Sequence, residues 1–138
     1  MTSDIQQVRR FNREVTQRIG VLQDRFLGRN RPLGESRLLV EIGVDGLEVR
    51  TLRGKLGLDS GYVSRMLRSL EKQGLVETIS APGDARVRYS RLTRKGLSER
   101  EELDRRSDDL AQSLLTPLGD KQRQRLVAAM AEVERLLR

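Results

Sequence analysis

Apolar residues recur every three or four positions through the first part of the chain, which is the spacing of one face of an α-helix. Residues 2–4 offer N-capping oxygens, and Gly28 is a typical helix end. The turn formers of residues 32–34 then separate this long helix from a shorter one, which ends in the turn at Asp45-Gly46. The long stripe comprises Ile5, Val8, Phe11, Val15, Ile19, Leu22 and Phe26, and the short one Leu38, Leu39 and Ile42.

Two further short helices follow, joined by a tight connection. The first carries Leu52 and Leu56 and stops at Gly57, although its start at residues 48–51 also suits a short strand. Asp59 or Ser60 caps the second, which spans about residues 60–73 and places Val63, Leu67 and Leu70 inward. Two helices joined in this way, the second of them basic, indicate a helix-turn-helix.

The period then changes from about 3.6 to two, which predicts a β-hairpin. Leu75 to Ser80 forms one strand and Arg86 to Leu92 the other, with Pro82-Gly83 at the centre of a type II turn. On the returning strand Val87 and Tyr89 share one face, whereas Arg86 and Arg88 share the other. A basic hairpin after a helix-turn-helix is a wing, here residues 79–92.

Helical spacing returns after the hairpin and continues to the end of the chain. Thr93 caps a long helix, Pro117 and Gly119 break it, and a last helix runs to Arg138. The fold class expected is therefore mainly α with a small β-wing (α+β). The inward positions of these two helices are Leu97, Leu103, Leu110 and Leu114, then Leu126, Met130, Val133 and Leu137.

Length and composition narrow the functional classes. The 138 residues suit one domain, and they contain neither Cys nor His. Thiol and Ser-His or Cys-His catalysis, disulfides and imidazole metal sites are thereby excluded, and we expect no enzyme, no cofactor and no metal. The paired acids Glu101-Glu102 and Asp108-Asp109 lie among arginines and indicate a solvated helix face. With no targeting or spanning segment, we expect a cytoplasmic, nucleoid-associated protein without membrane contact.

Positive charge is concentrated in the middle of the chain. Residues 45–95 carry 11 basic and 6 acidic side chains, within a net charge of +7 for the whole chain. An ordinary solvated face is the alternative, but a basic helix followed by a basic wing favours double-stranded DNA as the partner. The side chains off the apolar stripe suit phosphates and base edges, and with the wing residues they form the predicted site. These residues are Ser60, Gly61, Tyr62, Ser64, Arg65 and Arg68 on the helix, and Asp84, Arg86 and Arg88 on the wing.

The chain carries, in this order, the motifs Leu56-Gly57-Leu58, Val63-Ser64-Arg65, Leu70-Glu71, Gly74-Leu75-Val76, Asp84-Ala85-Arg86 and Leu92-Thr93-Arg94-Lys95-Gly96. Together these motifs resemble the MarR-type winged-helix regulators. The most specific are the Asp-x-Arg of the wing and the Leu-Thr-x-x-Gly that follows it. A departure is Arg53, where the family usually has a small residue.

The resemblance implies a homodimer that represses transcription, with residues 1–31 and 97–138 as dimerisation helices around a winged helix-turn-helix at 33–96. It further implies that Arg86 enters the minor groove and that Asp84 positions it. Many relatives bind a small-molecule effector, whose identity no residue here reveals. Residues 57–62 are similar to a subgroup in which the module precedes a GNAT acetyltransferase domain. The regulatory half of such an enzyme, or a dimeric protein-interaction module, is therefore the alternative function.

Overall fold

The computed structural model describes residues 2–19, 28–57 and 60–138. The chain divides within its fifth helix into two compact units, residues 1–104 and 105–138. The described elements are six helices and three strands: α1 (Thr2–Ile19), α2 (Leu33–Ile42), β1 (Leu47–Glu48), α3 (Val49–Leu56), α4 (Ser60–Lys72), β2 (Val76–Ala81), β3 (Asp84–Leu92), α5 (Arg94–Leu115) and α6 (Asp120–Leu137). The mainly helical fold class with a small β-wing is thus confirmed.

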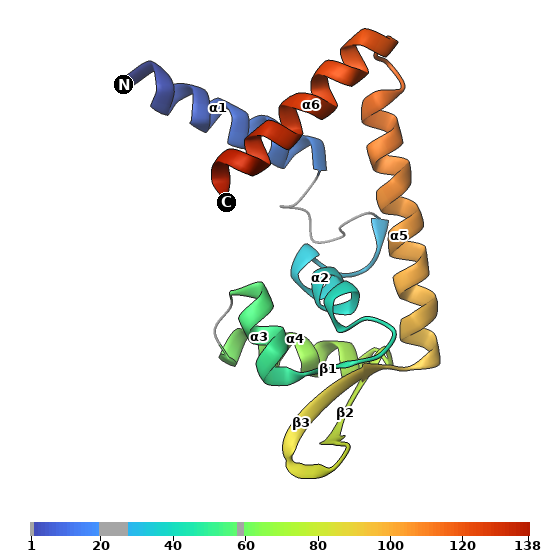
Figure 1. Ribbon diagram of the computed structural model, residues 1–138. Helices are drawn as coiled ribbons and strands as arrows, with labels where there is room; N and C mark the ends of the chain where they lie inside the picture. The colour runs from blue at the N-terminus through green and yellow to red at the C-terminus, as the bar shows by residue number, and fades with distance from the viewer. Residues whose placement is uncertain (1, 20–27, 58–59) are drawn as a thin grey trace. The chain divides into compact units, whose positions relative to one another are not determined.

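Helices α2, α3 and α4 pack against one another and against the base of a three-stranded antiparallel sheet of order β1-β3-β2 (Figure 1). Their apolar positions meet in a single core, because each short helix is apolar along one face only. The predicted inward residues Val63, Leu67 and Leu70 are all buried there. The core comprises Leu38, Leu39, Ile42, Val49, Leu52, Val63, Met66, Leu67, Leu70, Leu75, Val76, Leu92 and Leu103.

Three element boundaries were left open or predicted differently from the sequence. The first helix is described only to Ile19, so the predicted positions Leu22 and Phe26 lie outside the described residues. Both alternatives for residues 48–51 contribute, since a two-residue strand, β1, runs directly into α3. The returning hairpin strand begins at Asp84, two residues earlier than expected, because Ala81 already pairs with Asp84 across Pro82-Gly83.

The later boundaries follow the predicted signals. Thr93 Oγ1 accepts a hydrogen bond from the backbone N–H of Gly96 at 3.1 Å, which caps the first turn of α5. Helix α5 ends at Leu115 and α6 begins at Asp120, so the break falls at Pro117 and Gly119 as expected. None of the described helices is both long and apolar enough to cross a membrane.

Candidate nucleic-acid interface

Helix α4 buries one face and presents the other. Gly61, Arg65 and Arg68 are exposed, and Ser64 is half-buried. Ser60 begins the helix, and its side chain lies outside the described set. The structure therefore places the predicted cationic residues of this helix away from the core, where they are accessible to a partner.

Tyr62 links the exposed face of α4 to α2. Its side chain remains 39% exposed, and the guanidinium of Arg65 lies over its ring at 5.9 Å from the centroid. A Cβ added to Gly34 would lie 3.0 Å from the Tyr62 hydroxyl oxygen, so α2 approaches this ring closely. A cation over an aromatic ring at this range is weakly attracted, which favours one orientation of Arg65 on the surface.

The wing residues Asp84 and Arg86 contact each other. Asp84 Oδ1 accepts hydrogen bonds from the Arg86 backbone N–H at 3.0 Å and from its Nε at 3.3 Å. The two-residue connection before them requires a glycine, since Gly83 has a φ of 82°. Arg86 is 91% exposed along its side chain, so the carboxylate orients the guanidinium while leaving it open to a ligand.

Strand register decides which face of the sheet carries the wing arginines. Paired residues of antiparallel strands point to the same side, and Val76 pairs with Leu92 while Ser80 pairs with Arg88. Because Val76 and Leu92 are buried in the core, the row that continues through Ser90 to Arg88 lies on the face that packs against the helices. Arg88 is therefore on the helix side of the sheet, and its neighbour Tyr89 is on the opposite side. The pairing of β2 with β3 shifts between Ser80 and Ala81, so this alternation does not extend to Arg86 and Val87.

A hollow of about 220 Å³ lies where α3, α4 and β3 meet. It brings together three predicted site residues, Ser64, Arg86 and Arg88. It also adds Arg50 and Arg53 of α3, which the sequence analysis did not select because α3 shows no motif for DNA contact. The lining is Val49, Arg50, Arg53, Ser64, Arg86, Val87 and Arg88.

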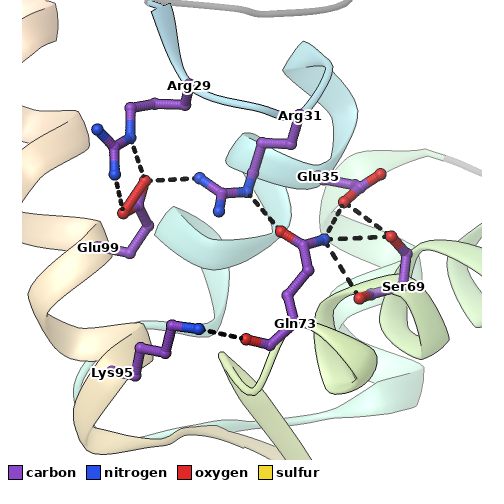
Figure 2. A network of polar contacts seen from close by, with 7 residues as sticks. All are labelled: Arg29, Arg31, Glu35, Ser69, Gln73, Lys95 and Glu99. Carbon is purple, nitrogen blue, oxygen red and sulfur yellow. Dashed lines mark hydrogen bonds and ion pairs between the residues drawn. The ribbon is translucent and has the colours of Figure 1, made fainter.

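A buried ion-pair network lies at the other end of α4 (Figure 2). Glu99 of α5 is 8% exposed and accepts hydrogen bonds from two arginines that precede α2. Arg29 donates through Nε at 2.6 Å and Nη2 at 2.7 Å, and Arg31 donates through Nη1 at 2.6 Å. This carboxylate therefore joins the start of α5 to the segment before α2.

The second half of this network reaches the last turn of α4. Gln73 accepts a hydrogen bond from Arg31 Nε at 3.1 Å and donates to Glu35 Oε1 at 2.9 Å. Ser69 of α4 also donates to Glu35, and Lys95 of α5 donates to the backbone carbonyl of Gln73 at 2.9 Å (Figure 2). Helix α4 is thus tied at its end to both α2 and α5.

Opposing effects set the protonation of Glu99. Burial raises the pKa of its carboxyl, but the hydrogen bonds and positive charges of Arg29 and Arg31 outweigh burial and hold the pKa below its ordinary value. The hydrogen bond to Glu99 in turn raises the pKa of the Arg29 guanidinium, although its partial burial opposes this. Glu99 is therefore ionised at neutral pH, as a partner of two arginines must be.

Gly96, the glycine of the Leu-Thr-x-x-Gly motif, is required by packing. A Cβ at this position would lie 1.9 Å from the carbonyl oxygen of Leu75, so any side chain would displace the backbone. The backbone N–H of Thr93 donates to that same carbonyl at 3.0 Å. The motif therefore fixes the junction between the sheet and α5.

Comparison with known proteins shows which family this fold resembles. The family model of the MarR family matches residues 27–87, which span α2, α3, α4 and most of the hairpin. This part of the chain is therefore similar to the MarR family. The resemblance expected from the sequence is thereby confirmed for this region. Separately, the residues that the structure describes hold no cluster of three or more acidic side chains that suits a metal ion.

Two proteins similar to this chain align with different shares of it. YdgJ of Bacillus subtilis, an uncharacterised HTH-type transcriptional regulator, is 27% identical over 89 residues, 64% of this chain and 54% of YdgJ. The chain thus spans about half the length of that relative. A MarR variant of E. coli complexed with operator DNA is 24% identical with a TM-score of 0.73, covering 96% of this chain and 97% of the other.

A third relative was solved with a small molecule. PcaV of Streptomyces coelicolor, a transcriptional regulator in complex with its natural ligand, is 21% identical with a TM-score of 0.65. The alignment covers 95% of this chain and 91% of PcaV. At these identities the two solved structures establish the shared fold, and the contacts of each with DNA or ligand belong to that protein.

Proposed function

We propose that this chain is a homodimeric transcription regulator that binds double-stranded DNA sequence-specifically and represses transcription in the cytoplasm, on the nucleoid. The observation that carries the proposal is the hollow in which Ser64 of α4 meets Arg86 and Arg88 of the wing. Residues 60–73 would enter the major groove and residues 79–92 would lie at the minor groove. The operator complex of the E. coli MarR variant, which shares the fold, supports this assignment.

The site residues divide by what they contact. Arg65 and Arg68, with the small residues Ser60, Gly61 and Ser64 and the ring of Tyr62, meet base edges and phosphates in the major groove. Arg86, oriented by Asp84, enters the minor groove, where an arginine responds to groove width and negative potential. Arg88 lies further from the hairpin turn on β3 and contacts the sugar-phosphate backbone of the DNA.

Dimerisation is proposed from the apolar residues left exposed on the outer helices. On α1, Ile5, Val8 and Phe11 are exposed although they form one stripe, and on α6 Val127 and Met130 are exposed. A second copy of the chain would cover them, with residues 1–31 and 97–138 as the dimerisation helices of a single 138-residue domain. Light scattering should show a dimer. Removal of residues 1–30 should cause aggregation, and a well-folded truncated monomer would contradict the assembly.

A small-molecule effector is proposed by analogy with the ligand complex of PcaV. The chain has neither Cys nor His, so such an effector acts through noncovalent contact and not through a thiol or a His-bound metal. Its chemical identity is not specified by any described residue.

The decisive experiment combines genomic selection with the purified protein and anisotropy titration of the selected site. We expect Arg65→Ala to narrow the gap between operator and scrambled duplex, because a base-edge contact carries discrimination. Arg86→Ala should lower affinity for both duplexes and reduce the slope of log affinity against log salt by about two per dimer. If the selection enriches no DNA site, the regulatory half of a two-domain acetyltransferase or a protein-interaction module becomes the better hypothesis.

A further inference from the structure

The hollow between α3, α4 and β3 concentrates positive charge without compensation. Four of its seven lining residues are arginines, and none is acidic. Among the described residues, Arg50, Arg53 and Arg88 form no ion pair, and only Arg86 has a carboxylate partner, Asp84. Like charges gathered around one space repel each other, so this arrangement is unfavourable until an anion enters.

Two of these arginines come from α3 and are unrelated to the wing motif. Arg50 and Arg53 stand three residues apart on a helix, so their side chains share a face. Arg53 is the residue at which the sequence departs from the MarR pattern, and it is half-exposed at the hollow and not part of the core. Its charge therefore serves a surface site, since a core role would require a small or apolar side chain.

We propose that this hollow is a phosphate site in which Arg50 and Arg53 of α3, with Arg88 of β3, clamp one phosphodiester of the bound duplex. The inference rests on the proposed DNA-binding function and extends it to α3. A guanidinium matches two phosphate oxygens with parallel N–H donors, and Ser64 adds a hydroxyl donor from α4. Because about 10–15 Å³ of such space is enough to hold one water, a hollow of about 220 Å³ accommodates a phosphate group.

The position of the hollow explains why a single phosphate would be held there. It lies between the helix assigned to the major groove and the hairpin assigned to the minor groove, and the strand of the duplex that separates two grooves is its sugar-phosphate backbone. Contacts to that backbone fix register and orientation but carry no base information. Arg53 thus sets how α4 and the wing are placed on DNA, without reading sequence.

The test is a salt titration by fluorescence anisotropy on one fixed duplex, with Arg53→Gln as the main variant. Loss of one phosphate contact should lower the slope of log affinity against log salt by about one per winged helix, hence by about two for a dimer. Arg53→Lys should keep the slope and lose part of the affinity, because charge survives while the paired donors do not. Arg37→Gln, an exposed arginine of α2 outside the hollow, is the matched control and should change neither quantity.

Two further readouts separate this site from its alternatives. The ratio of operator to scrambled affinity should be unchanged in Arg53→Gln, and the melting temperature should hold or rise because a repulsive charge is removed. An unchanged slope in Arg53→Gln, while Arg86→Ala lowers it, overturns the phosphate site and leaves the proposed function standing. Absence of any salt-dependent duplex binding by the wild-type protein overturns both.

The source of the phosphate is tested without DNA. Inorganic phosphate at millimolar concentration, compared with chloride at equal ionic strength, should not raise the melting temperature of the wild-type protein, because a free phosphate makes only one of the many contacts that hold a duplex and binds the hollow too weakly. A rise that is present in wild type and abolished in Arg53→Gln would show a site for a free phosphate compound, and would overturn the assignment to the DNA backbone.

Discussion

Replacing Glu99 by Gln isolates the charge that holds the buried network together. The carboxylate receives three guanidinium hydrogen bonds, and both Glu99 and Arg31 are only 8% exposed. The amide is nearly isosteric and keeps one acceptor oxygen, so the change removes charge and little volume. Arg31 would then stay buried with only neutral amides, those of Gln73 and of the new Gln, as side-chain partners, and a charge without a counter-charge is costly in a poorly hydrated site.

The magnitude follows from the exposure of the two arginines. Removing one partner of a buried pair typically costs about 3–5 kcal/mol. The Arg29 side chain is 30% exposed and can regain water, so we expect the lower end, about 3 kcal/mol. At roughly 4 °C per kcal/mol for a chain of this length, the melting temperature should fall by roughly 12 °C.

The assay is thermal unfolding at matched protein concentration, with Glu101→Gln as the control. Glu101 lies on the same helix but is exposed, so its neutralisation should shift the melting temperature by at most about 1–2 °C. A double variant, Glu99→Leu with Arg31→Met, should recover most of the lost stability, because an apolar pair carries no unpaired charge. If Glu99→Gln melts with the control, the network does not stabilise the fold and the reasoning fails.

The pH dependence supplies an independent check. The pKa of Glu99 is lower in the folded protein than its ordinary value of about 4.3, so its stabilising contribution is complete above that pH and is lost as pH falls through the folded pKa. The difference in melting temperature between wild type and Glu99→Gln should therefore be constant from pH 7 to about 5 and shrink below about pH 4. A difference that grows on acidification would contradict this sign.

Three further predictions concern packing and the wing. Gly96→Ala should lower the free energy of unfolding by roughly 1–3 kcal/mol, because its Cβ meets the Leu75 carbonyl. Gly54→Ala, with open space around it, should raise the free energy of unfolding by about 0.5–1 kcal/mol, and equal shifts in the melting temperatures of the two variants would refute the contrast. Leu67→Ala should cost roughly 2–5 kcal/mol in denaturant unfolding, since this side chain is 1% exposed. Asp84→Ala should weaken duplex binding less than Arg86→Ala in anisotropy titrations with no change in melting temperature, and an effect larger than that of Arg86→Ala would refute its orienting role.

Local signals in the sequence were enough to predict most elements. Pro82-Gly83 specified the hairpin because proline fixes one backbone angle and glycine permits the positive φ that follows. Gly57, likewise in the left-handed region, ended α3 where expected. In both cases the deciding interaction lies within a few residues along the chain, so pattern alone could identify it.

The polar network could not be predicted in this way. Its central contacts join Arg29 and Arg31 to Glu99, about 70 positions apart, and nothing in the sequence near Glu99 distinguishes it from the exposed Glu101. Helical spacing did supply one clue, since Gly96, Glu99 and Leu103 are three and four residues apart and all are buried. A charged residue in a buried row indicates a partner, but only the tertiary fold names the partner.

For the wing, the sequence prediction lacked one fact, which is the face of β3 that packs against the helices. Sequence alternation separated Arg86 and Arg88 from Val87 and Tyr89 but left open which pair faces the helices. The buried residues at the base of the same strand decide it for Arg88, because Ser90 and Leu92 follow Arg88 in one row at a spacing of two. The other face is fixed by Tyr89, whose hydroxyl donates to the Asp45 carbonyl at 2.7 Å. Ser90 is the last buried residue of this row, and the exposed Arg88 comes next towards the hairpin turn. The length of β3 between the core and the turn therefore determines how far from the core the wing holds its positive charge.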